Sequence, residues 1–365
     1  MHQKISLMIP VCSAYSFVTE QITKEKMCDY INAIDEKHKA SVAGKRIVFF
    51  INDDKYVLAY YNQGIFVFIL EYSIEGNNHY RALRDSKTSK TNEILEQNSD
   101  ISILMQKLDE QFARIKLKKN ILFDGSYTDY VLTTYKLSGY NFEENVQLIW
   151  GLLRNLSLDQ SEHEEAMKSI RELSVTLGDN VYLTAGWGAR IFIEDEDHKE
   201  SDYYESYLEA ETDIQYCWLF TTFLRRKFDM VMSKGYSNAK IDKTQLLGKS
   251  YDLAYSIAKI KRVSDSNTTR YKIELYEKIV VASRLEKIYD ETRFFINIVQ
   301  EKIDQSRSKQ INMVLYILSI LGGISAIVSI VSAVVSADLM AKSLSLSLAS
   351  ILTVAILLVY VRNNR

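Results

Sequence analysis

The sequence has very few residues that break helices. Its 365 residues include one proline, Pro10, and 13 glycines. Neither residue type occurs from Lys249 to Leu321, so the strongest helix breakers are missing from roughly seventy consecutive positions. We therefore expect long helices in the C-terminal half. One of them is predicted to begin near Arg270 and, if it continues to Ala337, to rise about 100 Å at roughly 1.5 Å per residue.

Cysteine and histidine are also scarce, which argues against several kinds of chemistry. The three cysteines are dispersed and odd in number, so no disulfide framework or zinc spacing is visible. The five histidines have no metal-ligand spacing, and no Ser/His/Asp or Cys/His set has the local context of a catalytic site. The formal charge of −2 gives no reason to expect direct binding of nucleic acid. We therefore expect a protein that is not an enzyme and has no resident cofactor.

Charged residues are absent from two long stretches near the C-terminus. Met313–Ala337 and Ser343–Val361 are uncharged and largely apolar, and only residues 338–342 separate them. Each stretch is long enough to cross roughly 30 Å of hydrocarbon as a helix, so the pair is predicted to form a transmembrane hairpin. The basic residues that flank the hairpin on the side of the polar body are Lys302, Arg307, Lys309, Arg362 and Arg365. The positive-inside rule then predicts that both termini lie in the cytoplasm.

The polar body divides into a mixed part and a helical part. Short β-rich runs alternate with turns and helical segments as far as Glu194–Glu200, which we interpret as a charged linker. The predicted strands are Ile5–Pro10, Arg46–Ile51, Tyr56–Tyr61, Ile65–Tyr72, Ile121–Phe123 and Asp129–Tyr135, and the predicted helices are Ser99–Leu117, Glu143–Leu156 and Glu162–Leu177. Val181–Ala185 and Ala189–Ile193 are predicted to form one strand with a glycine kink.

Long helices are expected after the linker. The first is predicted to begin at Ser201 or Asp202, where Glu205 supports an N-terminal cap, and its apolar face includes Glu211 as a polar exception. A second helix is expected over Thr244–Val263. The predicted fold is thus an α+β cytoplasmic domain, long antiparallel helices, a stalk helix continuous with the first transmembrane helix, and a C-terminal two-helix transmembrane hairpin. The corresponding ranges are 1–195, 196–269, 270–312, 313–337 (first span), 338–342 (outer loop), 343–361 (second span) and 362–365 (basic tail).

A heptad seam runs from the predicted stalk into the first span. Its positions change in order from polar to aliphatic to small residues: Asp304, Ser308, Ile311, Leu315, Leu318, Gly322, Ser325, Ser329, Ser332 and Ser336. Two interpretations stay open. The glycine and serines allow close packing of membrane helices, or they line a pore in which Ile311, Leu315 and Leu318 form a hydrophobic gate. In the second interpretation, Asp304 would form a carboxylate ring that favours cations.

This layout resembles the CorA family of divalent-cation channels. The resemblance covers the order of the parts, and it is strongest around Trp187 with the helix Tyr203–Met232 and over Glu291–Ala337. It implies a pentamer in a cell membrane, a pore lined by the first membrane helix, and cytoplasmic domains that control opening. It also implies that carboxylates at subunit interfaces bind divalent cations, for which Glu194–Asp197 is the candidate. The other interpretation of that run is a solvated linker.

The sequence departs from the family at the outer mouth of the pore. The family motif Gly-Met-Asn is missing, and the corresponding stretch reads Val335-Ser336-Ala337-Asp338-Leu339-Met340. Asp338 is a candidate for an acidic ring there, or is simply solvated. Without the motif, the chain resembles the divergent CorA-type membrane effectors of type III CRISPR defence. That resemblance implies a sensor for a nucleotide second messenger, such as an S-adenosylmethionine–AMP conjugate, which permeabilises the bacterial inner membrane.

Three residues are candidates for contact with such a ligand. Arg225 and Arg226 are able to hold a phosphate, or else belong to a solvent or inter-subunit face. Trp187 is able to stack on a base, or else packs against the helical layer. The alternatives to a ligand-gated channel are a divalent-cation transporter of the CorA type, a membrane-anchored sensor or scaffold without a pore, and a membrane-disrupting toxin.

Overall fold

The structure is a computed structural model of the whole chain. It describes residues 2–17, 21–74, 80–96, 99–120, 122–123, 127–128, 130–154, 163–186, 188–194, 202–233, 243–263 and 270–334. The chain divides into two compact units, Met1–Ile296 and Asn297–Arg365.

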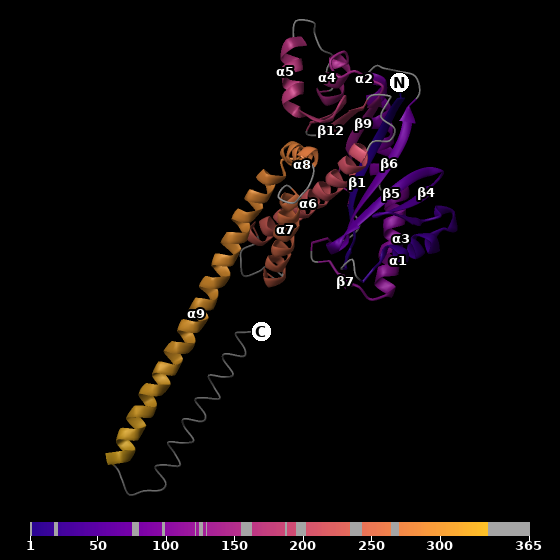
Figure 1. Cartoon of the computed structure of the whole chain (residues 1–365). Helices are drawn as coiled ribbons and strands as arrows, with labels where there is room; N and C mark the ends of the chain where they lie inside the picture. The colour runs from indigo at the N-terminus through magenta and orange to yellow at the C-terminus, as the bar shows by residue number, and fades with distance from the viewer. Residues whose placement is uncertain are drawn as a thin grey trace. The chain divides into compact units, whose positions relative to one another are not determined.

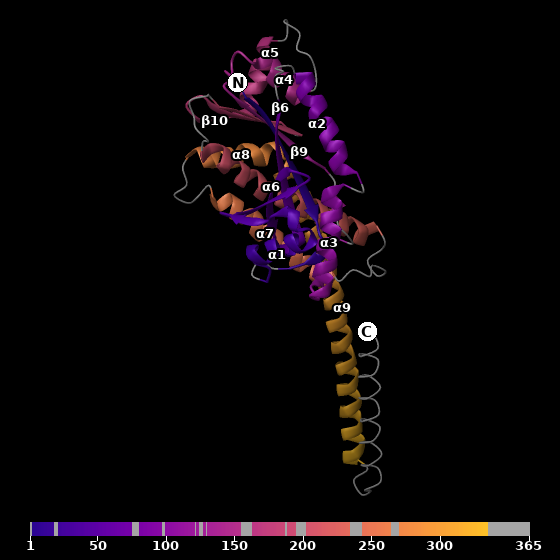
Figure 2. The same ribbon diagram turned by 90° about the vertical axis from the view of Figure 1, so that its right-hand side faces the viewer.

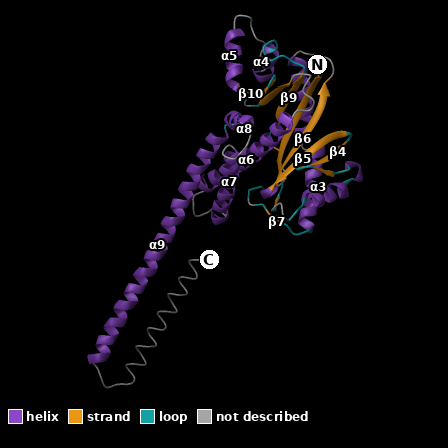
Figure 3. Cartoon of the chain, in the orientation of Figure 1, coloured by secondary structure: helices purple, strands orange, loops and turns teal. Residues whose placement is uncertain are grey.

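The first unit is built on a mixed β-sheet (Figure 3). Its strands are β1 (His2–Cys12), β3 (Ser41–Ala43), β4 (Arg46–Ile51), β5 (Asp54–Tyr61), β6 (Ile65–Ile74), β8 (Tyr127–Thr128), β9 (Leu132–Ser138), β10 (Ser174–Gly178), β11 (Val181–Ala185) and β12 (Ala189–Glu194). The order is β10-β11-β12-β9-β1-β6-β5-β4-β3, and β8 pairs with β1. Among these neighbours, β12 and β9 run parallel and the rest run antiparallel. A separate pair joins β2 (Tyr15–Ser16) to β7 (Lys118–Lys119).

The single proline lies in the central strand β1, where a missing backbone donor would usually be costly. Pro10 pairs with Val67 of β6 on one side. On the other side, pairing with β9 ends at Met8 and pairing with β8 starts at Val11. The residue next to Thr128 on that side, residue 129, lies outside the described residues, so the described pairing of Pro10 is the one with β6.

One face of the sheet packs against five helices in an apolar core. Ile5, Leu7, Ile9 and Val11 alternate along β1 and join a core that includes residues of all five helices. These helices are α1 (Lys24–Ile34), α2 (Tyr80–Leu95), α3 (Asp100–Arg114), α4 (Val146–Arg154) and α5 (His163–Leu173). Short 3₁₀ turns occur at Glu36–His38 and Asn62–Gly64.

The opposite face is covered by α6 (Asp202–Ser233), as Figures 1 and 2 both show. Helices α7 (Lys243–Val263) and α8 (Arg270–Ala282) pack against α6 in turn. The predicted α+β domain followed by long helices is confirmed, and α6 begins at the predicted residue.

Several predicted elements need correction. The helix predicted over Glu162–Leu177 ends at Leu173, because Val175 and Leu177 alternate with more exposed residues and pair as β10 with β11. Leu122 and Phe123 are buried but belong to no strand, while residue 121 lies outside the described residues. The strand predicted from Asp129 begins at Leu132 instead. Helices α1 and α2 were not predicted.

The predicted kinked strand is a hairpin. Strands β11 and β12 run antiparallel, and the Gly186 N–H donates to the Ala189 carbonyl at 2.9 Å across the turn. Glu194 is the last residue of β12 and is buried, so it does not belong to a solvated linker. Residues 195–201 lie outside the described residues.

The predicted continuous helix from Arg270 is wrong, because the chain turns between α8 and α9 (Leu285–Val334). Arg284 adopts a left-handed backbone conformation with φ of 54°. The Ser283 N–H donates to the Ile279 carbonyl at 2.9 Å and closes the last turn of α8. Ile279 and Leu285 are both buried, so packing ends this helix without a glycine or proline.

Helix α9 carries the backbone of the first predicted span as far as Val334. Within the part of the chain that the structure describes, no helix combines the length and apolarity needed to cross a membrane. Residues 335–337 of that span and the whole second span, Ser343–Val361, lie outside the described residues.

Candidate functional site

A cleft of about 700 Å³ lies beside the hairpin formed by β3 and β4. The end of β5, the start of α1, and helices α6 and α8 complete its wall. The residues that line it are Thr23, Lys24, Ala43, Gly44, Lys45, Arg46, Ala59, Tyr60, Tyr61, Glu205, Ser206, Glu209, Thr212, Asp213, Tyr271 and Lys272. The cleft is thus assembled from six elements of the first unit.

Charges of both signs meet across the cleft. The Lys45 Nζ forms an ion pair with Glu209, and the Arg46 Nη1 lies 3.1 Å from Glu205 Oε2. Both pairs join the hairpin to α6. Lys24 Nζ donates to the Gly44 carbonyl at 3.1 Å, which holds a third cation at the same turn.

A partly buried carboxyl lines the cleft. Asp213 accepts hydrogen bonds from Tyr61 at 2.9 Å and from Tyr276 at 3.4 Å. Burial raises the pKa of Asp213 above its ordinary value, and the hydrogen bond from Tyr61 opposes that rise. Burial and the neighbouring Asp213 charge raise the pKa of Tyr61 well above its ordinary value. Tyr61 is therefore a neutral hydrogen-bond donor at physiological pH.

A second pocket of about 230 Å³ adjoins the first. The two pockets share Tyr60, Tyr61 and Asp213, and the second extends between α6 and α7 towards Lys259. Tyr61 stacks on Tyr216 with ring centroids 4.5 Å apart and planes inclined by 11°. Together the two pockets combine cations, carboxylates and tyrosine rings, which suits an organic anion more than an apolar ligand.

An ion pair is buried between the sheet and α6. Arg190 of β12 bonds to Glu211 of α6 at 2.9 and 3.2 Å, and both side chains are fully buried. Arg190 also donates to the Gly186 carbonyl, and Gln215 donates to Glu211 at 2.5 Å. This contact explains why the apolar face of α6 includes one glutamate. Sequence periodicity located Glu211 but gave no sign of its partner.

A second buried polar group lies further along the same face. Lys136 bonds to Glu194 at 2.8 Å and lies 4.4 Å from the centroid of the Tyr204 ring. The Tyr204 hydroxyl lies 2.5 Å from Ser6 Oγ and 3.1 Å from Glu71 Oε1. Polar side chains thus tie α6 to the sheet at several points.

The predicted ligand residues lie elsewhere. Arg225 is paired with Glu291 at 2.8 Å, which links α6 to the start of α9. Arg226 lies over the Phe223 ring at 5.2 Å. Trp187 lies outside the described residues. Neither arginine is among the residues that line the cleft.

The predicted pore residues lie on or beyond α9. Ile311, Leu315 and Leu318 are 59%, 55% and 56% exposed, and Asp304 and Gly322 are exposed too. Tyr316, which does not belong to the seam, is 68% exposed, so this part of the helix is exposed on more sides than the seam alone. The backbone at Ser325, Ser329 and Ser332 is helical, while Ser336 and Asp338 lie outside the described residues.

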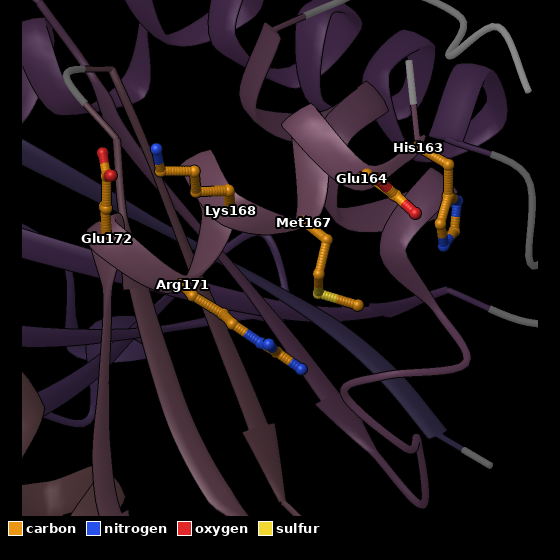
Figure 4. A pocket seen from close by; sticks show the side chains of 6 residues that line it. All are labelled: His163, Glu164, Met167, Lys168, Arg171 and Glu172. Atoms are coloured by element: carbon orange, nitrogen blue, oxygen red, sulfur yellow. The ribbon is translucent and has the colours of Figure 1, made fainter. Parts of the chain in front are cut away.

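Two other features of the described residues bear on a possible site. A hollow of about 590 Å³ is lined by six residues, all from α5, so one helix alone would hold a ligand there. Figure 4 shows these side chains. One of them, Arg171, is paired with Glu143 at 2.8 Å. Among the described residues, no group of three or more His, Cys, Asp or Glu side chains is arranged to hold a metal ion. The predicted divalent cations at subunit interfaces stay a prediction.

Sequence reasoning did not single out the residues of the cleft. The one available signal was the turn Gly44-Lys45-Arg46 between two strands, and it pointed only to a hairpin. No protein-family model matches the chain, and comparisons with curated proteins and with solved structures find no match either. The function is therefore inferred from the residues themselves.

Proposed function

We propose that the chain is one subunit of an oligomeric, CorA-like membrane channel, and that its α+β unit senses a small ligand of the nucleotide type. A pentamer is the favoured assembly, with both termini on the cytoplasmic side of a bacterial inner membrane. Ligand binding opens the pore and permeabilises the membrane, which suits a role in antiviral defence. The partners are then membrane lipid, further copies of the chain and the ligand.

The observation that carries this proposal is the apolar exposure of α9. Between residues 311 and 320 of α9, large apolar side chains project on every side, including Ile311, Leu315 and Ile320. A helix that is apolar all round is typical of a membrane span or of the interior of an assembly. The proposed first span, Met313–Ala337, continues from this region, and an uncharged second stretch follows it.

An oligomer is required because one hairpin cannot enclose a pore. The seam with Leu315, Leu318 and Gly322 would face the shared axis, with aliphatic residues before the small ones. Rings of aliphatic side chains close a narrow pore by excluding water. The absent Gly-Met-Asn motif speaks against the alternative of a magnesium-selective transporter.

Ion flux from liposomes tests the proposed gate. The full chain carrying Leu315→Ser and Leu318→Ser is expected to leak potassium without any ligand, because two polar rings replace the aliphatic ones. The matched control carries Met313→Ser and Ile320→Ser, which add the same number of serines roughly opposite the seam at about 100° per residue. The control is expected to remain closed.

The other outcomes distinguish the alternatives. No leak from the gate variant, in a sample that mass measurement shows to be oligomeric, supports an anchor or scaffold without a pore. Equal leak from the gate variant, the control and the parent chain supports a membrane-disrupting toxin. A monomer or dimer in the membrane contradicts the channel in any form.

A further inference from the structure

Two ion pairs at the cleft hold the β3–β4 hairpin against α6. Lys45 pairs with Glu209 and Arg46 pairs with Glu205. In each pair at least one partner is largely exposed: the side chain of Lys45 is 81% exposed and that of Glu205 is 73% exposed. Exposed ion pairs contribute little to stability, because water competes with both partners. These two pairs are thus contacts that another anion is able to replace.

The cleft provides more positive charge than these two pairs use. Within the described residues, the one hydrogen bond of the Lys24 ammonium group goes to the Gly44 carbonyl. Lys272, which also lines the cleft, has no ion pair or hydrogen bond to any described residue. The N-terminus of α1, capped by Thr23, borders the cleft and adds the positive end of a helix dipole. Of the three carboxylates in the wall, Asp213 already accepts two tyrosine hydroxyls.

The size and the aromatic lining of the cleft restrict its ligand further. A volume of about 700 Å³ lies within the range of roughly 300–1,000 Å³ that is typical of small-molecule sites. Tyr60, Tyr61 and Tyr271 are among the residues that line the wall. Tyrosine rings stack on nucleobases without selecting a sequence, while lysine and arginine bind phosphate through charge-assisted hydrogen bonds.

We propose that this cleft binds a phosphate-bearing small molecule of the nucleotide type, and that its phosphate displaces Glu205 and Glu209 from Arg46 and Lys45. Lys24 and Lys272 complete the set of cations around the phosphate. Binding therefore exchanges two contacts between the hairpin and α6 for two contacts between the hairpin and the ligand. The role of this exchange in opening a pore rests on the proposed function, whereas the binding itself does not.

Calorimetric titration of the full detergent-solubilised chain with AMP tests the exchange. Lys45→Gln with Arg46→Gln is expected to weaken AMP binding about tenfold or more, because charge-assisted bonds to phosphate are lost. Glu205→Gln with Glu209→Gln is expected to strengthen it about threefold to tenfold, because the competing carboxylates are removed. Adenosine, which lacks phosphate, is expected to bind at least about tenfold more weakly than AMP.

Matched controls separate competition from net charge. Glu164→Gln with Glu165→Gln on α5 changes the charge equally and is expected to leave AMP binding unchanged, as is Lys107→Gln on α3. The proposal is overturned if AMP does not bind the parent chain, if adenosine binds as tightly as AMP, or if the Glu205/Glu209 variant binds AMP no more tightly than the parent.

The AMP titration and the flux assay test the cleft proposal and the channel proposal separately. Absent AMP binding together with a leak from the Leu315/Leu318 variant overturns the cleft and supports the channel. AMP binding that follows the expected order, without any leak from that variant, supports the cleft and overturns the channel.

Discussion

The two faces of the central sheet bury their side chains in different ways. On one face, Leu7 of β1 and Ile191 of β12 join an apolar core with α1 to α5. On the other face, the adjacent residues Ser6 and Arg190 meet polar partners from α6. The face towards α1 to α5 is therefore a core in which any apolar side chain of suitable shape fits. On the face towards α6, each buried polar group needs a particular hydrogen-bond or ion-pair partner.

This difference has an energetic consequence. Apolar burial stabilises by area and has no preferred direction, at about 25 cal/mol per Å². A buried charge that loses its partner is strongly destabilising, although replacement of the whole pair by apolar residues is often neutral. The face covered by α6 should then respond to substitutions in pairs, while the apolar face responds to each substitution by itself.

The largest effect is expected at the buried ion pair. Glu211→Leu leaves Arg190 charged and unpaired, and should lower the free energy of unfolding by about 3–5 kcal/mol. The double variant Arg190→Met with Glu211→Leu should recover most of this loss. Urea denaturation of the full chain in detergent, followed by tryptophan fluorescence, measures both. Equal loss in the single and double variants would show that the two faces do not differ.

A cavity on the apolar face is expected to cost slightly less. Leu7→Ala removes a fully buried side chain and should lower the free energy of unfolding by about 2–5 kcal/mol. Leu7→Met, which conserves volume, serves as the control and should cost less than about 1.5 kcal/mol. The same denaturation experiment measures the two variants, and a loss from Met as large as that from Ala would contradict the volume argument.

A smaller effect is expected from one hydroxyl on the polar face. Tyr204→Phe removes the contacts with Ser6 and Glu71 and should lower the free energy of unfolding by about 1 kcal/mol, the net value of an ordinary hydrogen bond. Tyr135→Phe on the apolar face is the matched control, and a smaller loss is expected there because no hydrogen bond to its hydroxyl is found in the described structure. A larger loss from the control would contradict the comparison.

The smallest effect is a dependence of stability on pH. Burial raises the pKa of Asp213 above its ordinary value of 3.8, so the folded chain binds this proton more tightly than the unfolded chain. Stability should therefore fall as pH rises from the ordinary value through the raised one. Denaturation midpoints measured from the ordinary pKa of Asp213 up to its raised pKa should fall with pH in the parent chain. The contribution of Asp213 to this fall should be absent in the Asp213→Asn variant. Identical slopes for the two chains would contradict it.

The sequence predicted the elements that depend on local pattern. Arg46–Ile51 is strand β4 because alternation and flanking turn residues define it, and α6 begins at Asp202 as its capping residues indicate. The turn at Arg284 could not be predicted, because tertiary packing of Ile279 and Leu285 ends the helix in a stretch without breakers. Periodicity gave Glu211 as an exception, but its partner is 21 residues away on a strand.

The cleft could not be predicted from the sequence either. Its basic residues come from a turn, a helix start and α8, and no spacing along the chain relates Lys45 to Lys272 or to Glu209. Those residues meet only because the sheet edge and α6 lie together. Arg225, which the sequence offered as a candidate for a ligand phosphate or for a solvent or inter-subunit face, is paired with Glu291.

Single-channel recording in planar bilayers tests the central claim most directly. For the purified full chain, the account predicts discrete conductance steps, and for the Leu315→Ser, Leu318→Ser variant it predicts steps without any ligand. A smooth leak without defined levels, or silence from both chains in bilayers that contain the oligomer, would contradict the proposed channel.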